Sequence, residues 1–305
     1  MKQNISLIKR YLMYFKERFP LVGAFLYAGS LFYMSYFSAN LFYVHLPVNF
    51  LKSAIGCIVI FLVLLHLRLF DEHKDYDRDI KAHPDRLLSK GIITLNDLKK
   101  LFIGVVLLEV MFSLYLGIDA FCVWVVIMVW SYLMYVEFFA PVYLNQRMGL
   151  YLISHQLIVP MIVIFGLAER TVMGLITIAD IVFMFMLSIG AICATITYEI
   201  SRKTWSSEQE HDCADSYTKT WGITKTIIVN QTCAFISSII FIGIFHYDQS
   251  SPVFTFIALI LFIQFLTAEL LFYKNPSKKN SKKVELSGIL FLLGIFINAG
   301  ICMYI

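Results

Sequence analysis

Residues 50–79 read FLKSAIGCIVIFLVLLHLRLFDEHKDYDRD, and this stretch decides the fold class. It begins with a run of mostly apolar residues that is long enough for a helix to span the hydrocarbon core of a bilayer, which takes about 20 residues. The run then ends abruptly in closely spaced acids and bases. The stretch therefore predicts a transmembrane helix that leads directly into a charged segment.

The rest of the chain has the same apolar character. Of its 305 residues, 59% are hydrophobic and 15% are charged, whereas roughly a quarter are charged in an ordinary soluble domain. Apolar runs predict spans near 20–43, 47–70, 99–117, 120–140, 149–168, 174–198, 223–246, 252–273 and 285–305. We therefore expect an all-α polytopic membrane protein, a single domain over 1–305 with about nine transmembrane helices in a bundle around a central cavity.

The basic residues predict the orientation, because Lys and Arg near helix ends are retained on the cytoplasmic side. With a cytosolic N-terminus, all of the 25 Lys and Arg residues except Lys52 and Arg170 fall on the cytosolic side. The two long polar segments, 71–98 and 199–222, would then form cytosolic cap loops on a protein of the bacterial inner membrane. Their spacing suggests two four-helix halves, with the ninth helix as an appendage. The bases are scattered and form no stripe, so nucleic acid is not an expected partner.

The first cap loop carries Asp71, Asp75 and Asp79 at positions i, i+4 and i+8. If the helix continues, these carboxylates line one face and repel one another unless cations lie among them. Hard oxygen ligands suit Mg²⁺, which commonly bridges carboxylates to substrate phosphates, so a diphosphate is the natural substrate group. The alternative is a solvated helix end in which neighbouring bases form i,i+3 and i,i+4 ion pairs with the acids.

This segment resembles the first aspartate-rich motif of the UbiA superfamily of intramembrane prenyltransferases, NDxxDxxxD followed by Arg-Pro-Leu-x-x-Gly. Asp71 stands at the Asn position, and Glu72, Asp75 and Asp79 stand at the three Asp positions. Residues 86–91, RLLSKG, occupy the Arg-Pro-Leu stretch with Leu in place of Pro. Asp71 at the Asn position and Glu72 at the first Asp position keep oxygen ligands there, and Arg86 keeps the basic residue.

The second cap loop resembles the family's second motif, DxxxD. Glu199 matches its first acid, but Lys203 stands where the second acid would be. A second metal would have to use Glu208, Glu210 or Asp212, or be replaced by the Lys203 ammonium as a phosphate-binding point charge. The alternative is that Arg202 and Lys203 are topological anchors and the later acids form a solvated loop.

Further candidates lie at or near the cytosolic helix ends. Arg147 is the basic residue of its loop and could bind diphosphate or act as a topological anchor. His155 lies inside an apolar run, where an interhelical hydrogen bond, acceptor binding and a role as a base are the alternatives. The expected acceptor and cavity residues are Tyr135, Tyr143, Asn145, His155 and Tyr198.

The resemblance implies a prenyltransferase that depends on Mg²⁺. The metal would be held by Asp71, Glu72, Asp75, Asp79 and Glu199, which are also the expected catalytic residues. Contacts to the diphosphate would come from Arg68, Lys74, Arg86, Lys90, Arg147, Arg202 and Lys203. The isoprenoid group of a prenyl diphosphate would pass to an aromatic or other lipophilic acceptor within the membrane. The alternatives are a terpene cyclase of the same architecture and a cation transporter, although transport favours ionisable groups near the bilayer midplane.

Overall fold

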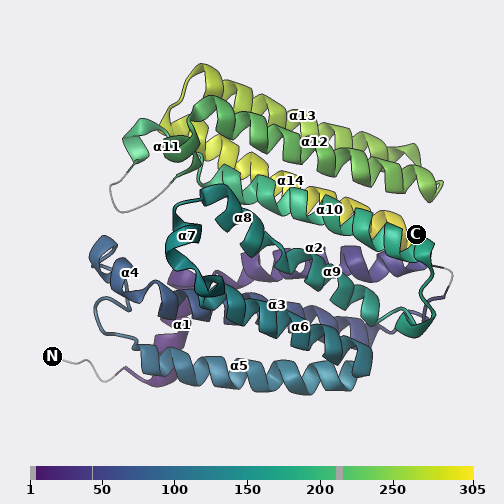
Figure 1. Cartoon of the computed structure of the whole chain (residues 1–305), viewed down its shortest axis with the longest axis horizontal. Coiled ribbons are helices and arrows are strands. Elements are labelled where there is room, and N and C mark those ends of the chain that lie inside the picture. The colour runs from purple at the N-terminus through teal and green to yellow at the C-terminus, as the bar shows by residue number, and fades with distance from the viewer. Residues whose placement is uncertain (1–4, 43, 211–215) are drawn as a thin grey trace.

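The computed structural model describes residues 5–42, 44–210 and 216–305, and the regular structure in these ranges is helical apart from one isolated bridge between His45 and Thr171. Figure 1 shows the long helices side by side as a bundle, with short helices gathered at one end. The long helices are α2 (Leu21–Ser38), α3 (Phe50–Lys74), α5 (Leu95–Leu116), α6 (Ile118–Tyr135), α10 (Ile178–Arg202), α12 (Ile223–Tyr247), α13 (Pro252–Lys274) and α14 (Lys278–Tyr304). The shorter ones are α1 (Leu7–Arg18), α4 (Tyr76–Ala82), α7 (Pro141–Asn145), α8 (Met148–Gln156), α9 (Ile158–Ala168) and α11 (Tyr217–Trp221).

In the described ranges, eight candidate spans are long and apolar enough to cross a membrane, with α8 and α9 together forming one of them, Met148–Ala168. The remaining long helix, α5, has 22 residues and packs along α3, but charged side chains interrupt its apolar character. With α5 counted, the described ranges contain nine such helical segments, in agreement with the expected number of about nine. The protein is an integral membrane protein with an all-helical bundle.

A buried polar contact explains how α5 accommodates an acidic side chain among these helices. His66 Nδ1 of α3 lies 2.8 Å from Glu109 Oε1 of α5, and His66 Nε2 lies 2.9 Å from Ser131 Oγ of α6. Trp124 Nε1 donates to Glu109 Oε2 at 2.9 Å. All of these side chains are buried, and such groups are tolerated in a membrane when they face the bundle interior and pair with one another. The contact holds α3, α5 and α6 in register.

The last helix, α14, is not an appendage, which corrects the expectation of a peripheral ninth helix. It packs against α2, α10 and α13. A Cβ at Gly300 would lie 3.4 Å from the backbone nitrogen of Met34 in α2, and a Cβ at Gly288 would lie 2.6 Å from Ser201 Oγ in α10. Glycine lets helices in a membrane approach this closely. The helix α14 thus joins the first and second halves of the bundle.

Two predicted spans differ from the observed helices. The span expected over 120–140 ends at Tyr135, because the next turn places Glu137, Phe138 and Phe139 at positive φ values of 48°, 52° and 57°. Residues other than glycine rarely adopt positive φ values, and backbone strain of this kind is concentrated at functional sites. The span over 149–168 is divided at Leu157 into α8 and α9.

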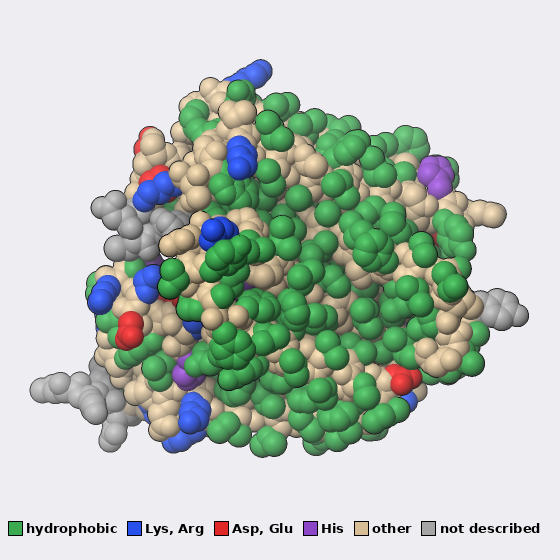
Figure 2. Space-filling model, viewed as in Figure 1, with side chains coloured by type: hydrophobic (Ala, Val, Ile, Leu, Met, Phe, Trp, Pro, Cys, Tyr) green, Lys and Arg blue, Asp and Glu red, His purple; other side chains and the backbone are tan. Residues whose placement is uncertain are grey.

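The two ends of the bundle differ in charge. The helices α3 and α10 both finish at the end that also carries α1, α4 and α11, and we call it the acidic end (Figure 1). In Figure 2 hydrophobic side chains cover the middle of the visible face, while Lys and Arg gather mainly at the acidic end. This distribution matches a belt of lipid around the middle of the bundle and water at its ends.

The opposite end contains a buried acid and a buried base that are neighbours in sequence. Arg170 donates from Nε to the Leu46 carbonyl at 2.8 Å and from Nη2 to Asn40 Oδ1 at 2.9 Å. Neither carboxyl oxygen of Glu169 has a hydrogen-bond partner, and burial raises the pKa of Glu169 to about 8. A neutral acid at neutral pH is the consequence.

Candidate active site

The first acidic segment is not one continuous helix. The helix α3 ends at Lys74, Asp75 forms its cap, and α4 begins at Tyr76. The backbone nitrogen of Asp75 donates to the Asp71 carbonyl at 2.9 Å, and that of Asp79 donates to the Asp75 carbonyl at 2.8 Å, so the turns follow each other closely. The expectation that Asp71, Asp75 and Asp79 share one face is wrong, because Asp79 contacts different partners from the other two.

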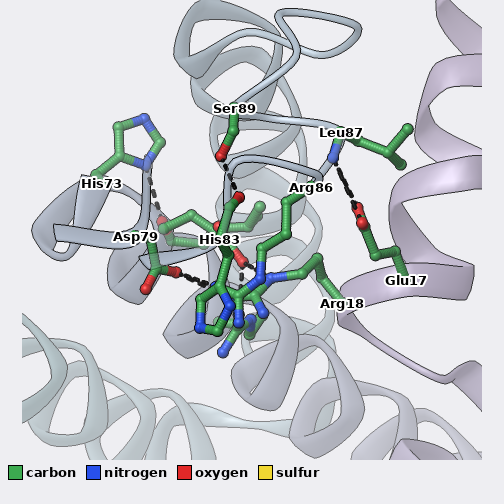
Figure 3. A network of polar contacts seen from close by, with 11 residues as sticks. Glu17, Arg18, His73, Asp79, His83, Arg86, Leu87 and Ser89 are labelled. Atoms are coloured by element: carbon green, nitrogen blue, oxygen red, sulfur yellow. Dashed lines mark hydrogen bonds and ion pairs between the residues drawn. The ribbon is translucent and has the colours of Figure 1, made fainter. Parts of the chain in front are cut away.

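Glu72 and Asp79 belong to what we call the arginine cluster, which comprises these two acids with Arg18, Arg68 and Arg86. Glu72 Oε1 accepts from Arg18 Nε at 2.7 Å and from Arg68 Nη2 at 2.6 Å. Asp79 Oδ2 accepts from Arg18 Nη2 at 3.1 Å and from Arg86 Nη1 at 2.5 Å. Figure 3 shows Arg18 and Arg86 converging beside Asp79. The guanidinium of Arg18 therefore joins both acids to the end of α1.

Other contacts fasten α1 to the same segment. The Leu87 backbone nitrogen donates to Glu17 Oε2 at 3.1 Å, as Figure 3 shows, and the Tyr11 hydroxyl donates to the Asp97 carbonyl at 2.8 Å. Burial and the nearby Arg18 lower the pKa of the Arg86 guanidinium, and burial raises the pKa of Tyr14. The arginine cluster is thus a partly buried group of ion pairs that connects α1, α3 and the 83–93 loop.

Asp71 and Asp75, which we call the open pair, have looser partners. Lys74 Nζ lies 3.6 Å from Asp71 Oδ1, and Arg78 Nη2 lies 3.9 Å from Asp75 Oδ1. The Asp71 side chain is 50% exposed, whereas that of Glu72 is 2% exposed. Lys74 also donates to the Tyr151 hydroxyl of α8 at 3.0 Å. The open pair therefore faces α8 with carboxylate oxygens that are accessible to a ligand.

His155 lies beside this pair with one ring nitrogen unused. Its Nδ1 lies 2.9 Å from the Tyr151 carbonyl, and its ring stacks on the Tyr151 ring at 3.9 Å between centroids. Because a carbonyl only accepts, Nδ1 of the neutral ring carries the proton and Nε2 keeps a lone pair. Nε2 is buried and has no hydrogen-bond partner. The strained turn after α6 places Phe138 against the same ring.

The second polar segment meets this region from α10. Glu199 accepts two hydrogen bonds from Arg202, at 2.5 and 2.8 Å, and Lys203 Nζ lies 3.4 Å from Oε1, one of the two accepting oxygens. Lys203 Nζ also lies 5.9 Å from the centre of the Tyr217 ring of α11. Burial, and next the charge of Glu199, raise the pKa of Tyr217. Lys74 of α3 donates to Tyr151 of α8, and Leu152 of α8 packs against Ile196 and Ile200 of α10, so the ends of α3 and α10 both adjoin α8.

Several expected site residues lie elsewhere. Arg147 stacks on Tyr143 at 3.9 Å and donates to its carbonyl, and Asn145 donates to Glu137 at 3.3 Å, all at the surface of the α7 turn. Lys90 pairs with Asp85 in the exposed loop.

Other expected residues are placed as follows. Tyr135 stacks on Phe70 at 4.9 Å, and Tyr198 lies near Glu199. Glu210 accepts from Ser216 and Thr218 at the start of α11, and Glu208 is exposed. Asp212 lies outside the described residues. The second segment thus contributes Glu199, Arg202 and Lys203 to the site.

Four residues at or beside the site were not predicted. Tyr151 precedes His155 by four residues, so the helical repeat of an apolar run with two polar rings could have indicated it. Arg18, Tyr217 and Tyr27 come from other segments, and Tyr27 of α2 lies near Tyr198 and Glu199. No local pattern connects Arg18 with Glu72, because 54 positions separate them.

The donor atoms decide where Mg²⁺ fits. Among the described residues, no group of three or more His, Cys, Asp or Glu side chains is arranged to hold a metal ion. Mg²⁺ keeps several waters and is commonly bound by one or two carboxylates together with substrate phosphates. The open pair offers two loosely paired carboxylates and meets that need. Glu72 and Asp79 suit a metal ion less well, since Glu72 Oε1 and Asp79 Oδ2 each already accept from two guanidinium groups.

The comparisons with known proteins agree with this architecture. The sequence matches no family model and no curated protein. The structure is similar to a solved structure of a digeranylgeranylglyceryl phosphate synthase, with a TM-score of 0.68 and 18% identity over 98% of this chain and 99% of that one. It is also similar to a UbiA homolog from Aeropyrum pernix K1, with a TM-score of 0.66 and 11% identity over 91% of this chain and 96% of that one. The chain therefore has the fold of the UbiA superfamily of intramembrane prenyltransferases.

Proposed function

We propose that this protein transfers an isoprenoid group from a prenyl diphosphate to a lipophilic acceptor, and that the reaction depends on Mg²⁺. One observation supports the proposal most. The end of α3 with the open pair and Lys74, and the end of α10 with Glu199, Arg202 and Lys203, both adjoin α8 within a UbiA fold. Acids and bases from two helix ends thus surround one region at the acidic end, which we place in the cytosol.

The chemistry of these residues suits diphosphate binding. Asp71 and Asp75 would hold Mg²⁺, which neutralises the charge that develops on the departing pyrophosphate. Lys74 and Lys203 carry ammonium groups, and Arg202 presents a planar guanidinium, so all three can bind phosphate oxygens. The aromatic rings beside His155 limit the access of water to the allylic carbon.

Transfer then requires an acceptor and a place for its proton. The bond between carbon 1 of the prenyl group and the diphosphate oxygen breaks, and its electron pair leaves with pyrophosphate. An electron pair of the acceptor forms the new bond to carbon, and the acceptor loses a proton. The departing pyrophosphate can take that proton, while the unpartnered Nε2 of His155 can accept a hydrogen bond from the acceptor. The acceptor is an aromatic ring or the hydroxyl of a lipid, as in the glyceryl lipid named for the similar synthase.

Pyrophosphate release tests the proposal. Protein purified in detergent with Mg²⁺ should release pyrophosphate from geranyl, farnesyl or geranylgeranyl diphosphate, and a product carrying both prenyl group and acceptor should form. The acceptor panel contains 4-hydroxybenzoate and a glycerol ether lipid. Release accompanied by a hydrocarbon or prenyl alcohol without any acceptor would instead identify a terpene cyclase. No release with any donor and acceptor would refute the proposal.

A further inference from the structure

The acids at the acidic end differ in how completely cations already occupy them. Glu72, Asp79 and Glu199 each contact two basic side chains. Asp71 and Asp75 each have one basic partner, at 3.6 and 3.9 Å. These last distances leave carboxylate lone pairs available, because a strong charge-assisted hydrogen bond is shorter, about 2.7–2.9 Å.

A divalent cation at Glu199 would meet strong opposition. Arg202 binds both carboxylate oxygens of Glu199, and Lys203 stands within 3.4 Å of one of them. Residues 199–203 therefore carry one negative and two positive charges, a net positive charge that repels Mg²⁺ and attracts phosphate. The same argument applies to Glu72, whose buried carboxylate would have to exchange two guanidinium groups for a metal ion.

We propose that the chain binds the diphosphate of its prenyl substrate with a single divalent cation, held by Asp71 and Asp75. Arg202 and Lys203 supply the positive charge on the α10 side, where a second metal ion would otherwise be needed. The inference rests on the proposed function and adds to it the number of metal ions and the identity of the second counter-charge. Lys203 acts as a point charge and Arg202 as a planar donor, both directed at phosphate oxygens.

Metal stoichiometry tests this directly and does not depend on turnover. The full-length protein in detergent is titrated with Mn²⁺ in the presence of farnesyl thiodiphosphate, a donor that ionises slowly, and free Mn²⁺ is followed by electron paramagnetic resonance. We expect one Mn²⁺ per chain at saturation. Asp75→Asn should weaken Mn²⁺ binding at least tenfold. Asp79→Asn is the matched control, an acid of the same segment in the arginine cluster, and should change Mn²⁺ affinity less than twofold.

Substitution of Lys203 tests the counter-charge. Lys203→Asp places a carboxylate four residues after Glu199 and should raise the stoichiometry to two Mn²⁺ per chain. Lys203→Met should keep one Mn²⁺ and weaken binding of the thiodiphosphate about tenfold. Lys203→Met also serves if Lys203→Asp fails to elute as a folded monodisperse protein.

The outcomes separate this inference from the proposed function. Two Mn²⁺ in the unmodified protein, or unchanged thiodiphosphate affinity in Lys203→Met, would overturn the single-metal site and leave the prenyltransferase proposal standing. No binding of farnesyl thiodiphosphate with any divalent cation would refute both. Equal loss of Mn²⁺ affinity in Asp75→Asn and Asp79→Asn would show that the arginine cluster opens to bind metal, and would also overturn the inference.

Discussion

The arginine cluster and the open pair draw their acids from the same short stretch, residues 71–79, yet they differ in nearly every physical respect. Glu72 is 2% exposed and has two arginine partners, whereas Asp71 is 50% exposed and lies 3.6 Å from one lysine. The helix break explains the separation. The helix α3 ends at Lys74 and α4 begins at Tyr76, so Asp79 is not held on the face of Asp71 and reaches the arginines that also bind Glu72. One motif thus supplies both the ion pairs that connect α1 to α3 and a candidate metal site.

The largest expected effect is on catalysis, where the open pair and the arginine cluster should differ. Asp75→Asn should reduce pyrophosphate release about 100-fold or more, because electrostatic stabilisation of the leaving group is lost. Asp79→Asn should retain most of the release, since its carboxylate is directed to Arg18 and Arg86. Release assays at saturating Mg²⁺ measure both. Equal losses in the two variants would remove the functional side of the comparison.

Stability should show the reverse pattern. Arg18→Gln takes one of two cations from both Glu72 and Asp79, and we expect it to destabilise the protein by about 1–3 kcal/mol. The melting temperature in detergent should fall, and trypsin should cut the 83–93 loop faster. Lys16→Gln, an exposed change in the same helix, is the control and should leave both measurements unaltered.

Glu169 offers a buried acid without the arginines of Glu72, and its stability contribution should depend on pH. Its pKa of about 8 in the folded state lies above the ordinary 4.5, so its contribution is complete below pH 4.5 and is lost as pH rises through 8. The loss amounts to at most about 5 kcal/mol. Glu169→Gln should therefore raise the melting temperature at pH 9 and leave it unchanged at pH 4.5. A similar shift at both pH values would contradict the assigned pKa.

The smallest effect on activity is expected for a residue outside the arginine cluster and the open pair. Arg147 stacks on Tyr143 at the surface and contacts no acid of either set in the described structure. Arg147→Gln should change the Michaelis constant for farnesyl diphosphate less than twofold. A tenfold increase would show that Arg147 reaches the diphosphate in the substrate complex.

The helical plan was accessible to sequence reasoning because about 20 apolar residues have few alternatives in a membrane. Helix ends were less accessible. The helix α5 begins at Leu95, four residues before the predicted span, because Thr94 and Asp97 form a capping box in polar sequence that hydropathy ignores.

The site was predictable where it rests on local spacing. Asp71, Asp75, His155 and Lys203 were all named from the sequence, and they lie on α3, α8 and α10, whose neighbouring parts pack together at the acidic end. The ion pairs of Glu72 and Asp79 were not predictable, because they involve Arg18 at the end of a separate helix. A tertiary ion pair of this kind leaves no local pattern in the sequence.

The position of α14 has a consequence for assembly in the cell. Because translation starts at the N-terminus, the other long helices insert before α14. The faces of α2 and α10 that pack on Gly300 and Gly288 therefore remain exposed to lipid until α14 inserts. Gly288 packs against Ser201, two residues from Glu199. The helix α14 must therefore be made and inserted before the α10 side of the site reaches its final position, so a truncation that removes α14 threatens the site as well as the bundle.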